Sequence, residues 1–316
     1  MSPPALRMGP IEWLMLVTLS LLWGASFFFN AVALQALAPF HLVLLRVGIA
    51  ALVLWLIIAV RRAPLPRGRR AWAGFLLMGL LNNALPFTLI VWGQTQISSS
   101  LAAILNATTP FFAVMLTHAL TADERISRGK LTGVLVGLAG VVLLIGPDAL
   151  AGIAGDTLGQ LAILGAAISY SLAGIFGRRM AGTVPLVNAA GMLTGATVLM
   201  LPLALAQPTV TPGLPDLAVG AVILGSAVLS TALAYLLYFR ILRAAGATNV
   251  LLVTLLVPVS ATLFGIGLLG ESLGWRTLAG MAIIFAGLAI IDGRLLRGRS
   301  VMRKAGAAGR SSPDSR

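Results

Sequence analysis

Two stretches of this sequence resemble each other, and they decide the fold: "TPFFAVMLTHALTADERISRGKLTGVLVGLAG" (109–140) and "VPVSATLFGIGLLGESLGWRTLAGMAIIFAG" (257–287). Each stretch contains a proline in an apolar run, then a glutamate, and then two glycines in a second apolar run. The matching residues are Pro110 with Pro258, Glu124 with Glu271, Gly133 with Gly280, and Gly140 with Gly287. A match in this order indicates that a segment of the chain has been duplicated.

A third match lies earlier in each half of the chain. The offset that pairs the two glutamates also lays "LLWGASF" (21–27) on "ISYSLAG" (168–174). One match could arise by chance, but three in the same order indicate two related halves. The sequence therefore predicts repeats at residues 11–146 and 157–293. The basic tail at 294–316 has no apolar period and is expected to be disordered.

The composition places both halves in lipid. Of the 316 residues, 59% are hydrophobic and 10% are charged, whereas a soluble protein has about 25% charged residues. Ten stretches are long and apolar enough to cross a membrane, which takes about 20 residues. They are 11–33, 40–60, 72–92, 100–120, 130–146, 157–177, 186–206, 217–239, 247–269 and 275–292. The predicted fold is all-α and integral to the membrane, with ten transmembrane helices.

The basic residues predict the orientation. With the N-terminus in the cytoplasm, cytoplasmic segments hold all but two of the 22 Lys and Arg residues, as the positive-inside rule requires. The two exceptions are Arg276, on the opposite side, and Arg46, within a span. Both termini are therefore expected in the cytoplasm. Because each half has an odd number of helices, the second half must enter the membrane inverted, a plan typical of secondary transporters.

These motifs together resemble a known family. "LLWGASF", "LAPFHLVLLR" (37–46) and the paired Pro, Glu and Gly blocks resemble the drug/metabolite transporter superfamily, specifically a ten-helix EamA-type permease. The resemblance implies a basket of two inverted five-helix repeats around a cavity lined by helices one, three, four, six, eight and nine. It also implies a transporter that exports small organic metabolites, such as amino acids or drug-like solutes, across the bacterial inner membrane by alternating access. In the second half Tyr170 stands where the first half has Trp23, so the cavity should be lopsided.

Polar and aromatic residues at the mid-depth of those six helices are the candidate substrate-binding residues. Such residues either pair across helices or line a wet cavity, because an unpaired polar group in lipid is costly. Of two adjacent amides, Asn83 is favoured over Asn82 because it shares a helix face with Pro86. The candidates are Trp23, Ser26, Asn83, Asn106, Thr109, Tyr170, Ser230 and Thr254, with Pro86, Pro110 and Pro258 as helix breaks that free backbone carbonyls.

Four further residues are candidates for coupling or gating. Arg46 could be the counter-ion of an anionic substrate group. Alternatively, it could bond to helix carbonyls or extend to the headgroups. This alternative is favoured because the second helix is not expected to line the cavity. His118 could carry a proton, although an interfacial histidine without a role is commoner. Glu124 and Glu271 could form gates, or could only stabilise helix N-termini.

The sequence argues against other classes of protein. The absence of Cys excludes disulfides and thiolate metal sites, and no metal or cofactor is predicted. A membrane-embedded enzyme would need an acid–base pair, a nucleophile or a metal cluster, and no such constellation is evident. A non-transporting partner subunit would be expected to carry a soluble module. The net charge is +13, but the basic residues cluster in short segments between apolar runs. The expected partners are therefore the lipid bilayer and a small-molecule solute, not nucleic acid. Proton coupling and the oligomeric state stay open.

Overall fold

The computed structural model describes residues 8–66, 68–121, 126–146, 155–178, 184–208 and 217–292. The helices of the first half are α1 (Pro10–Ala33), α2 (Pro39–Arg61), α3 (Arg69–Gly79), η1 (Leu80–Ala84), α4 (Leu85–Gly93), α5 (Ser99–Asn106), α6 (Thr109–Leu120) and α7 (Arg128–Ile145). Those of the second half are α9 (Gly155–Gly177), α10 (Pro185–Ala206), α11 (Leu217–Leu224), η3 (Gly225–Leu233), α12 (Ala234–Ala245), α13 (Ala247–Val250), α14 (Val253–Leu269) and α15 (Trp275–Asp292). The segments η1 and η3 are π-helical and lie within the third span of each half.

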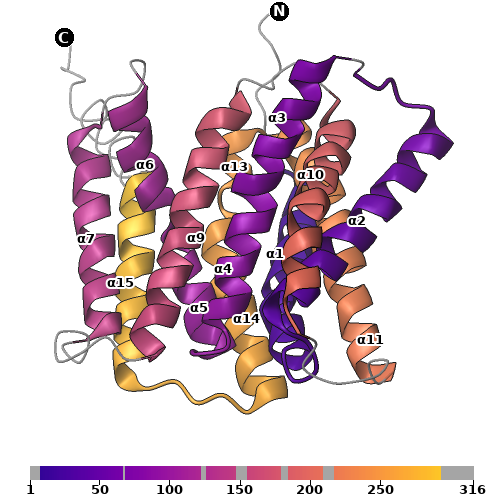
Figure 1. Ribbon diagram of the computed structural model, residues 1–316. Helices are drawn as coiled ribbons and strands as arrows, with labels where there is room; N and C mark the ends of the chain where they lie inside the picture. The colour runs from indigo at the N-terminus through magenta and orange to yellow at the C-terminus, as the bar shows by residue number, and fades with distance from the viewer. Residues whose placement is uncertain are drawn as a thin grey trace, which may run out of the picture.

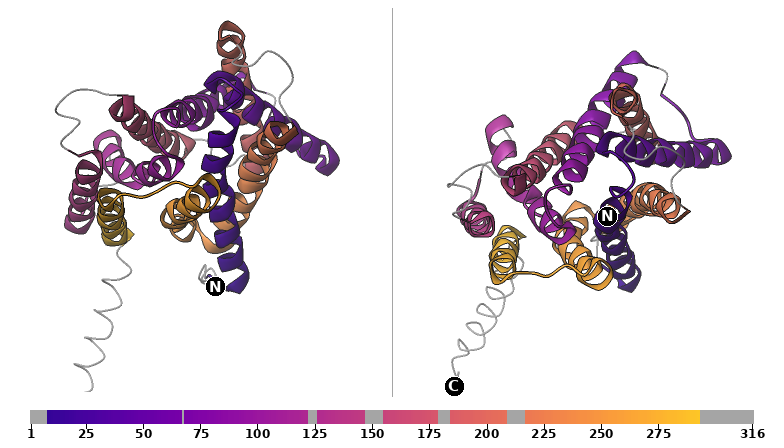
Figure 2. Two further views of the ribbon diagram at one scale, coloured as in Figure 1. Left: turned by 90° about the horizontal axis from the view of Figure 1, so that it is seen from below. Right: turned by 60° about the horizontal axis from the view of Figure 1, so that its bottom comes forward.

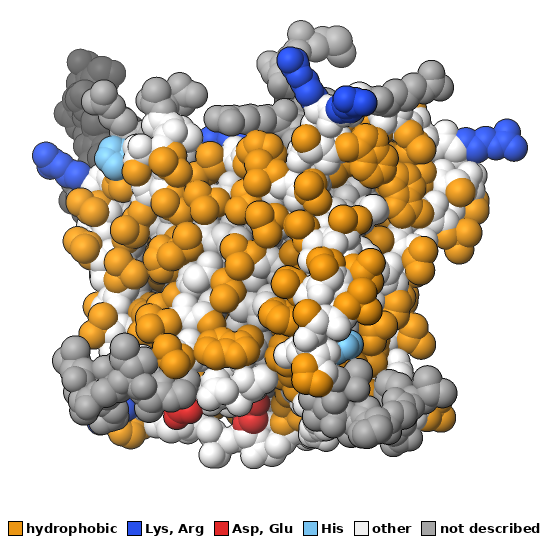
Figure 3. All heavy atoms as spheres, viewed as in Figure 1, with side chains coloured by type: hydrophobic (Ala, Val, Ile, Leu, Met, Phe, Trp, Pro, Cys, Tyr) orange, Lys and Arg blue, Asp and Glu red, His pale blue; other side chains and the backbone are white. Residues whose placement is uncertain are grey.

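The predicted all-α membrane fold is confirmed. Within the described ranges, nine helical stretches are long and apolar enough to cross a membrane, and the shorter apolar helix α14 supplies the tenth span. Apolar side chains cover the middle of the face shown in Figure 3, with basic side chains at the upper end and acidic ones at the lower end. This distribution is the one expected of a protein whose solvent is lipid around its middle.

The two halves run in opposite directions through the bundle. In Figure 1, α1 begins at the upper end, where α15 finishes, and the linker between α14 and α15 crosses the lower end. Corresponding helices of the halves pack on each other, α2 on α10 and α7 on α15. In the end views of Figure 2, α7 and α15 stand as a pair to one side of the other helices.

The π-helical register of η1 explains how the chain tolerates Pro86. The N–H of Leu85 donates to the Leu80 carbonyl, five residues back. The next bond in this register would reach the Leu81 carbonyl, but Pro86 has no N–H to donate. Instead Ser169 of α9 donates its hydroxyl to that carbonyl at 2.7 Å. A side chain of the second half thus satisfies the backbone group that Pro86 leaves free.

The fourth span of each half is discontinuous, and the sequence predicted Pro110 and Pro258 as the helix breaks within the stretches 100–120 and 247–269. The first break separates α5 from α6 just before Pro110. The second separates α13 from α14 at residues 251–252, whereas Pro258 lies inside α14, so this break does not fall at the proline. Thr109 donates its hydroxyl to the Asn106 carbonyl at 2.7 Å, the acceptor that Pro110 deprives of a helical N–H. Discontinuous helices surround the substrate sites of many inverted-repeat transporters.

The eighth span is longer than the sequence predicted. It continues through α12 to Ala245, beyond the predicted end at residue 239. Arg240 and Arg243 therefore lie in its last turns rather than in a loop. Both side chains are exposed. A long basic side chain can reach water from the last turns of a membrane helix, so a hydropathy pattern ends the span too early.

The packing of α7 on α15 depends on glycines. A Cβ added at Gly287 would lie 2.6 Å from the Gly133 carbonyl oxygen and 2.7 Å from the Gly137 Cα. We therefore expect Gly287→Ala to push the helices apart and destabilise the protein by about 1–3 kcal/mol, measured as a lower midpoint of thermal unfolding in detergent. The matched control is Gly174→Ala in α9, where an added Cβ meets nothing within 4 Å. Equal midpoints for the two variants would show that the packing of α7 on α15 does not depend on Gly287.

Candidate functional site

Arg46 lies in a buried polar cluster where the two halves meet. Its side chain is only 5% exposed. Its Nε donates to the Thr231 hydroxyl of η3 at 2.9 Å, and its Cζ lies 4.0 Å from the centre of the Phe87 ring of α4. The second contact has cation–π geometry. Arg46 thus contacts side chains of the third and eighth spans and does not extend to the headgroups, contrary to the interpretation that the sequence favoured.

Two neighbouring amides share one tyrosine oxygen beside Arg46. Tyr235 of α12 accepts hydrogen bonds from Nδ2 of Asn82 and from Nδ2 of Asn83, each at 3.0 Å. Asn83 is fully buried, and its Oδ1 has no hydrogen-bond partner within the described part of the chain. Asn82 is half-buried. Because two amides occupy the lone pairs of the Tyr235 oxygen, its own hydrogen remains to be donated.

Tyr170 of α9 completes this group. Its ring packs against both hydrophobic cores of the protein, and it is, with Tyr235, an ionisable neighbour of Arg46. We call the group the Arg46 cluster; its members are Arg46, Asn82, Asn83, Phe87, Tyr170, Thr231 and Tyr235. The first four belong to the first half of the chain and the last three to the second, so the cluster depends on how the halves sit together.

A row of aromatic rings connects Trp23 of α1 to the Arg46 cluster. The ring centroids of Trp23 and Tyr238 are 5.8 Å apart, those of Tyr238 and Phe239 are 5.3 Å apart, and those of Phe239 and Tyr235 are 6.2 Å apart. The structure therefore links the predicted residue Trp23 with Asn83 and Tyr170, although they lie on three different spans.

The other candidate binding residues are placed separately. Ser26 is buried and donates to the Trp23 carbonyl at 2.6 Å, and Thr254 donates to the Leu251 carbonyl at 2.7 Å where the ninth span breaks. Ser230 is buried, and its hydroxyl has no partner among the described residues; the same holds for Oδ1 of Asn106. The Thr109 carbonyl accepts a hydrogen bond from Ser171, the residue after Tyr170, at 3.0 Å.

Of the other candidates for coupling or gating, His118 and Glu271 lie away from the cluster. His118 is exposed at the end of α6, where its Nδ1 accepts the Ile126 N–H at 3.3 Å. Glu124 falls outside the described residues. Among the residues that are described, no three His, Asp or Glu side chains are grouped so that they could hold a metal ion.

Glu271, in the second half of the chain, accepts hydrogen bonds at the N-terminus of α5, in the first half. We call these four hydrogen bonds the Glu271 clasp. The Glu271 Oε1 accepts the Ser99 N–H and hydroxyl, each at 2.7 Å, and its Oε2 accepts the Ser100 N–H at 3.0 Å and the Ser100 hydroxyl. A carboxylate suits this place because the first N–H groups of a helix lack partners and its dipole favours negative charge. The preceding residue, Gly270, ends α14 in the left-handed conformation, with φ 66°.

The electrostatics keep Glu271 ionised in this conformation. Partial burial raises the pKa of the Glu271 carboxyl, but the hydrogen bonds from Ser100 and Ser99 lower it by more, so the pKa lies below its ordinary value. At neutral pH the carboxylate therefore holds the clasp and carries no proton.

A second polar contact closes the same end of the bundle. Asn30 of α1 donates to the Gln94 side chain just after α4 at 2.9 Å, and Gln94 donates in turn to the Phe27 carbonyl at 2.9 Å. These contacts lie where α1 and α4 end, and Glu271 lies in the linker between α14 and α15, which crosses the lower end in Figure 1. Most of the basic side chains visible in Figure 3 lie at the upper end. The contact between Asn30 and Gln94 connects the first span to the third. The Glu271 clasp connects the second half of the chain to the fourth span.

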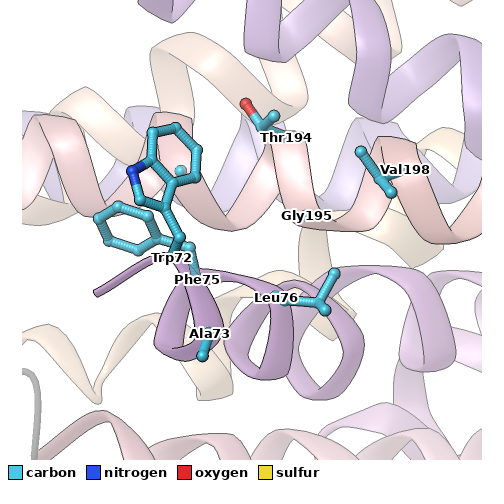
Figure 4. Close-up of a pocket in the computed structure, with 8 residues that line it drawn as sticks. Trp72, Ala73, Phe75, Leu76, Thr194, Gly195 and Val198 are labelled. Carbon is cyan, nitrogen blue, oxygen red and sulfur yellow. The ribbon is translucent and has the colours of Figure 1, made fainter. Parts of the chain in front are cut away.

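A hollow of about 340 Å³ lies elsewhere, between α3 and α10 (Figure 4). Trp72, Phe75 and Leu76 line one side, and Gly191, Gly195 and their neighbours line the other. None of the predicted binding residues lines it. Its walls are almost wholly apolar, and Trp72 and Leu76 are 43% and 42% exposed. It is therefore a notch in the lipid-facing surface and not the predicted cavity.

Sequence reasoning missed Tyr235 as a site residue. It falls within the predicted span 217–239 but near its end, where an aromatic residue is commonly part of the interfacial belt. The available signal was its spacing, because Tyr235 follows Thr231 by about one helical turn and Thr231 adjoins Ser230, a predicted cavity residue. Ser169, Ser99 and Ser100 gave no signal, since their partners lie in the other half of the chain.

Comparison with known proteins agrees with this architecture. Residues 11–146 and 157–292 each match the EamA-like transporter family. YoaV, an uncharacterized transporter of Bacillus subtilis, is 24% identical, covering 86% of this chain and 94% of its own. YedA, an uncharacterized inner membrane transporter of Escherichia coli, is 28% identical, covering 89% and 90%.

Two further similarities bear on relatives and on fold. An S-adenosylmethionine/S-adenosylhomocysteine transporter of Chlamydia trachomatis is 27% identical, covering 79% of this chain and 80% of its own. A solved crystal structure superposes with a TM-score of 0.65 at 22% identity, covering 90% of this chain and 98% of the other, and supports the fold alone. Both repeats match one family, whose members named here are transporters and not enzymes. The chain belongs to the EamA-like transporter family.

Proposed function

We propose that this protein is a secondary transporter that exports small organic solutes across the bacterial inner membrane by alternating access. The observation that carries the proposal is the Arg46 cluster, a set of buried polar side chains contributed by both halves. Buried polar groups of this kind are expensive in lipid and typically mark a substrate path. The Chlamydia relative, whose name specifies an organic solute, supports the same class of substrate.

In the proposed cycle the repeats, residues 11–146 and 157–293, move relative to each other around the cluster. The end bearing Arg61, Arg70 and Arg243 faces the cytoplasm, following the positive-inside rule, and both termini lie on that side. The Glu271 clasp and the contact between Asn30 and Gln94 then close the extracellular end. Opening that end requires these contacts to break while the cytoplasmic end closes.

The proposed orientation can be tested because the chain contains no Cys. Arg70→Cys and Ser272→Cys each introduce one thiol at an exposed position at opposite ends of the bundle. In intact cells a membrane-impermeant thiol reagent should label the Ser272 variant and should reach the Arg70 variant only after permeabilisation. Labelling of both variants in intact cells would show that the orientation or the topology is wrong.

Transport itself is tested in proteoliposomes. Vesicles loaded with unlabelled amino acids and organic acids should accumulate a labelled member of the same set by counterflow, and the flux should saturate with concentration. Protein-free vesicles provide the baseline. Flux equal to that baseline for amino acids, organic acids and nucleosides alike would reject the proposed function.

A further inference from the structure

Among the residues that the structure describes, no carboxylate neighbours the buried cation Arg46. The carboxylates in the described part of the chain are Glu12, Asp156, Glu271 and Asp292, and each lies in the first or last turn of a helix or in a linker. Arg46 lies well within α2 and is almost wholly buried. Its ionisable neighbours are Tyr170 and Tyr235, whose hydroxyls are neutral at physiological pH.

Such a charge is costly unless something pairs with it. The Thr231 hydroxyl accepts a hydrogen bond from one of the five guanidinium N–H groups, and the Phe87 ring supplies a cation–π contact. Neither neutralises the charge. Replacing a buried charge by an apolar side chain of similar volume often leaves stability unchanged or raises it, so retaining Arg46 has a stability cost that packing alone does not explain.

Arg46 and the Tyr235 hydroxyl offer donors to a ligand, which favours an anionic group. The terminal guanidinium nitrogens form a planar fork that matches the two oxygens of a carboxylate. The hydrogen of the Tyr235 hydroxyl remains to be donated because the amides of Asn82 and Asn83 occupy its oxygen. Oδ1 of Asn83 is a buried acceptor with no partner among the described residues, which suits an N–H or O–H group next to the carboxylate.

We propose that Arg46 binds the carboxylate of the transported solute, so that the substrates are small carboxylic acids bearing a neighbouring hydrogen-bond donor. This inference rests on the proposed transport function. It makes the second span, through this one side chain, part of the binding site. It also explains why a charge is kept where the fold does not need one.

The test uses matched solutes that differ in the carboxylate. Counterflow into proteoliposomes is measured for L-phenylalanine and its amide, lactate and lactamide, and benzoate and benzamide, with phenyl phosphate as a further anion. We expect flux of one or more of the acids and little flux of the corresponding amides. Equal flux of acids and amides, or a preference for phenyl phosphate over benzoate, would overturn the proposal. No flux of any solute would instead reject the transport function, and this inference with it.

Two variants separate binding from a structural role. Arg46→Met should lower acid flux at least about 30-fold, the loss typical of truncating a buried charge pair, while the thermal midpoint of the solute-free protein stays equal or rises. Arg46→Lys keeps the charge without the fork, and should retain a smaller preference for acids over amides. A lowered midpoint of Arg46→Met, or acid flux unchanged in either variant, would mean that Arg46 is structural.

Discussion

Replacing Glu271 by glutamine will loosen the end of the bundle at which Glu271 binds the N-terminus of α5. The carboxylate accepts four hydrogen bonds, two from Ser99 and two from Ser100. An amide offers one acceptor oxygen and turns an NH2 group toward donors, so about half of the clasp is lost. Hydrogen bonds to a charged group contribute about 1.5–3 kcal/mol each when buried, and less at this half-buried site, where solvent screens the charge. We expect a loss of about 1–3 kcal/mol overall.

The loosening is measured with a buried thiol. Ser26→Cys places one thiol on α1 beneath the closed end, at a side chain that is 7% exposed. Adding Glu271→Gln should raise the rate at which a soluble thiol reagent labels this Cys by about tenfold or more, because each 1.4 kcal/mol changes an equilibrium tenfold. Glu12→Gln is the matched control, since Glu12 accepts only the Gly9 N–H within its own helix end, at 2.9 Å. If both variants label at the same rate, the hydrogen bonds of Glu271 do not hold the two halves together at this end.

The pH dependence follows from the lowered pKa of Glu271. A carboxyl whose folded pKa lies below its unfolded value of 4.5 contributes stability that is fully present above pH 4.5 and is lost as the pH falls through the folded pKa. The difference in labelling between wild type and Glu271→Gln should therefore be constant above about pH 5 and shrink below it. A difference that shrinks between pH 6 and 8 would instead indicate a proton-carrying role at physiological pH.

The spans and the inverted repeat could be predicted because they are local or periodic properties of the chain. Apolar length identifies a span without reference to its neighbours, and the match of Glu124 to Glu271 reveals the duplication. The partners of Glu271 could not be predicted in the same way. Ser99 and Ser100 belong to the other half, and only packing of the halves brings them to the linker after α14.

The environment of Arg46 shows where reasoning from depth fails. Depth indicated that the cation was within a span, and the family resemblance implied that the second helix does not line the cavity. The structure instead directs it to Thr231 and Phe87, because α2 packs beside η3 and α4. Pro86 illustrates a partial success. The sequence indicates that a carbonyl is freed, but the π-helical register decides that it belongs to Leu81 and that Ser169 reaches it.

Replacing Asn83 by alanine should reduce transport by about tenfold or more. Asn83 is fully buried, and its amide links η1 to Tyr235 of the opposite half while its Oδ1 has no protein partner among the described residues. Losing one such polar contact costs about 1–3 kcal/mol, which is about 5- to 150-fold in an equilibrium. Asn82→Ala is the matched control, because Asn82 donates to the same oxygen at the same distance but is only half-buried. It should retain most of the transport.

A double-mutant cycle with Tyr235→Phe decides how Asn83 acts. If Asn83 acts only through its hydrogen bond to Tyr235, then Asn83→Ala will cause no further loss of transport in the Tyr235→Phe background. The coupling free energy will then equal the full effect of Asn83→Ala on transport in the wild type. If its free Oδ1 also binds solute, as we propose, the double variant will transport less than Tyr235→Phe alone. The thermal midpoints of all three variants should fall by similar amounts, because each leaves buried hydrogen-bonding groups of one network unpaired. Full transport by Asn83→Ala would remove Asn83 from the substrate path and would leave the Arg46 cluster without the acceptor that selects a donor-bearing acid.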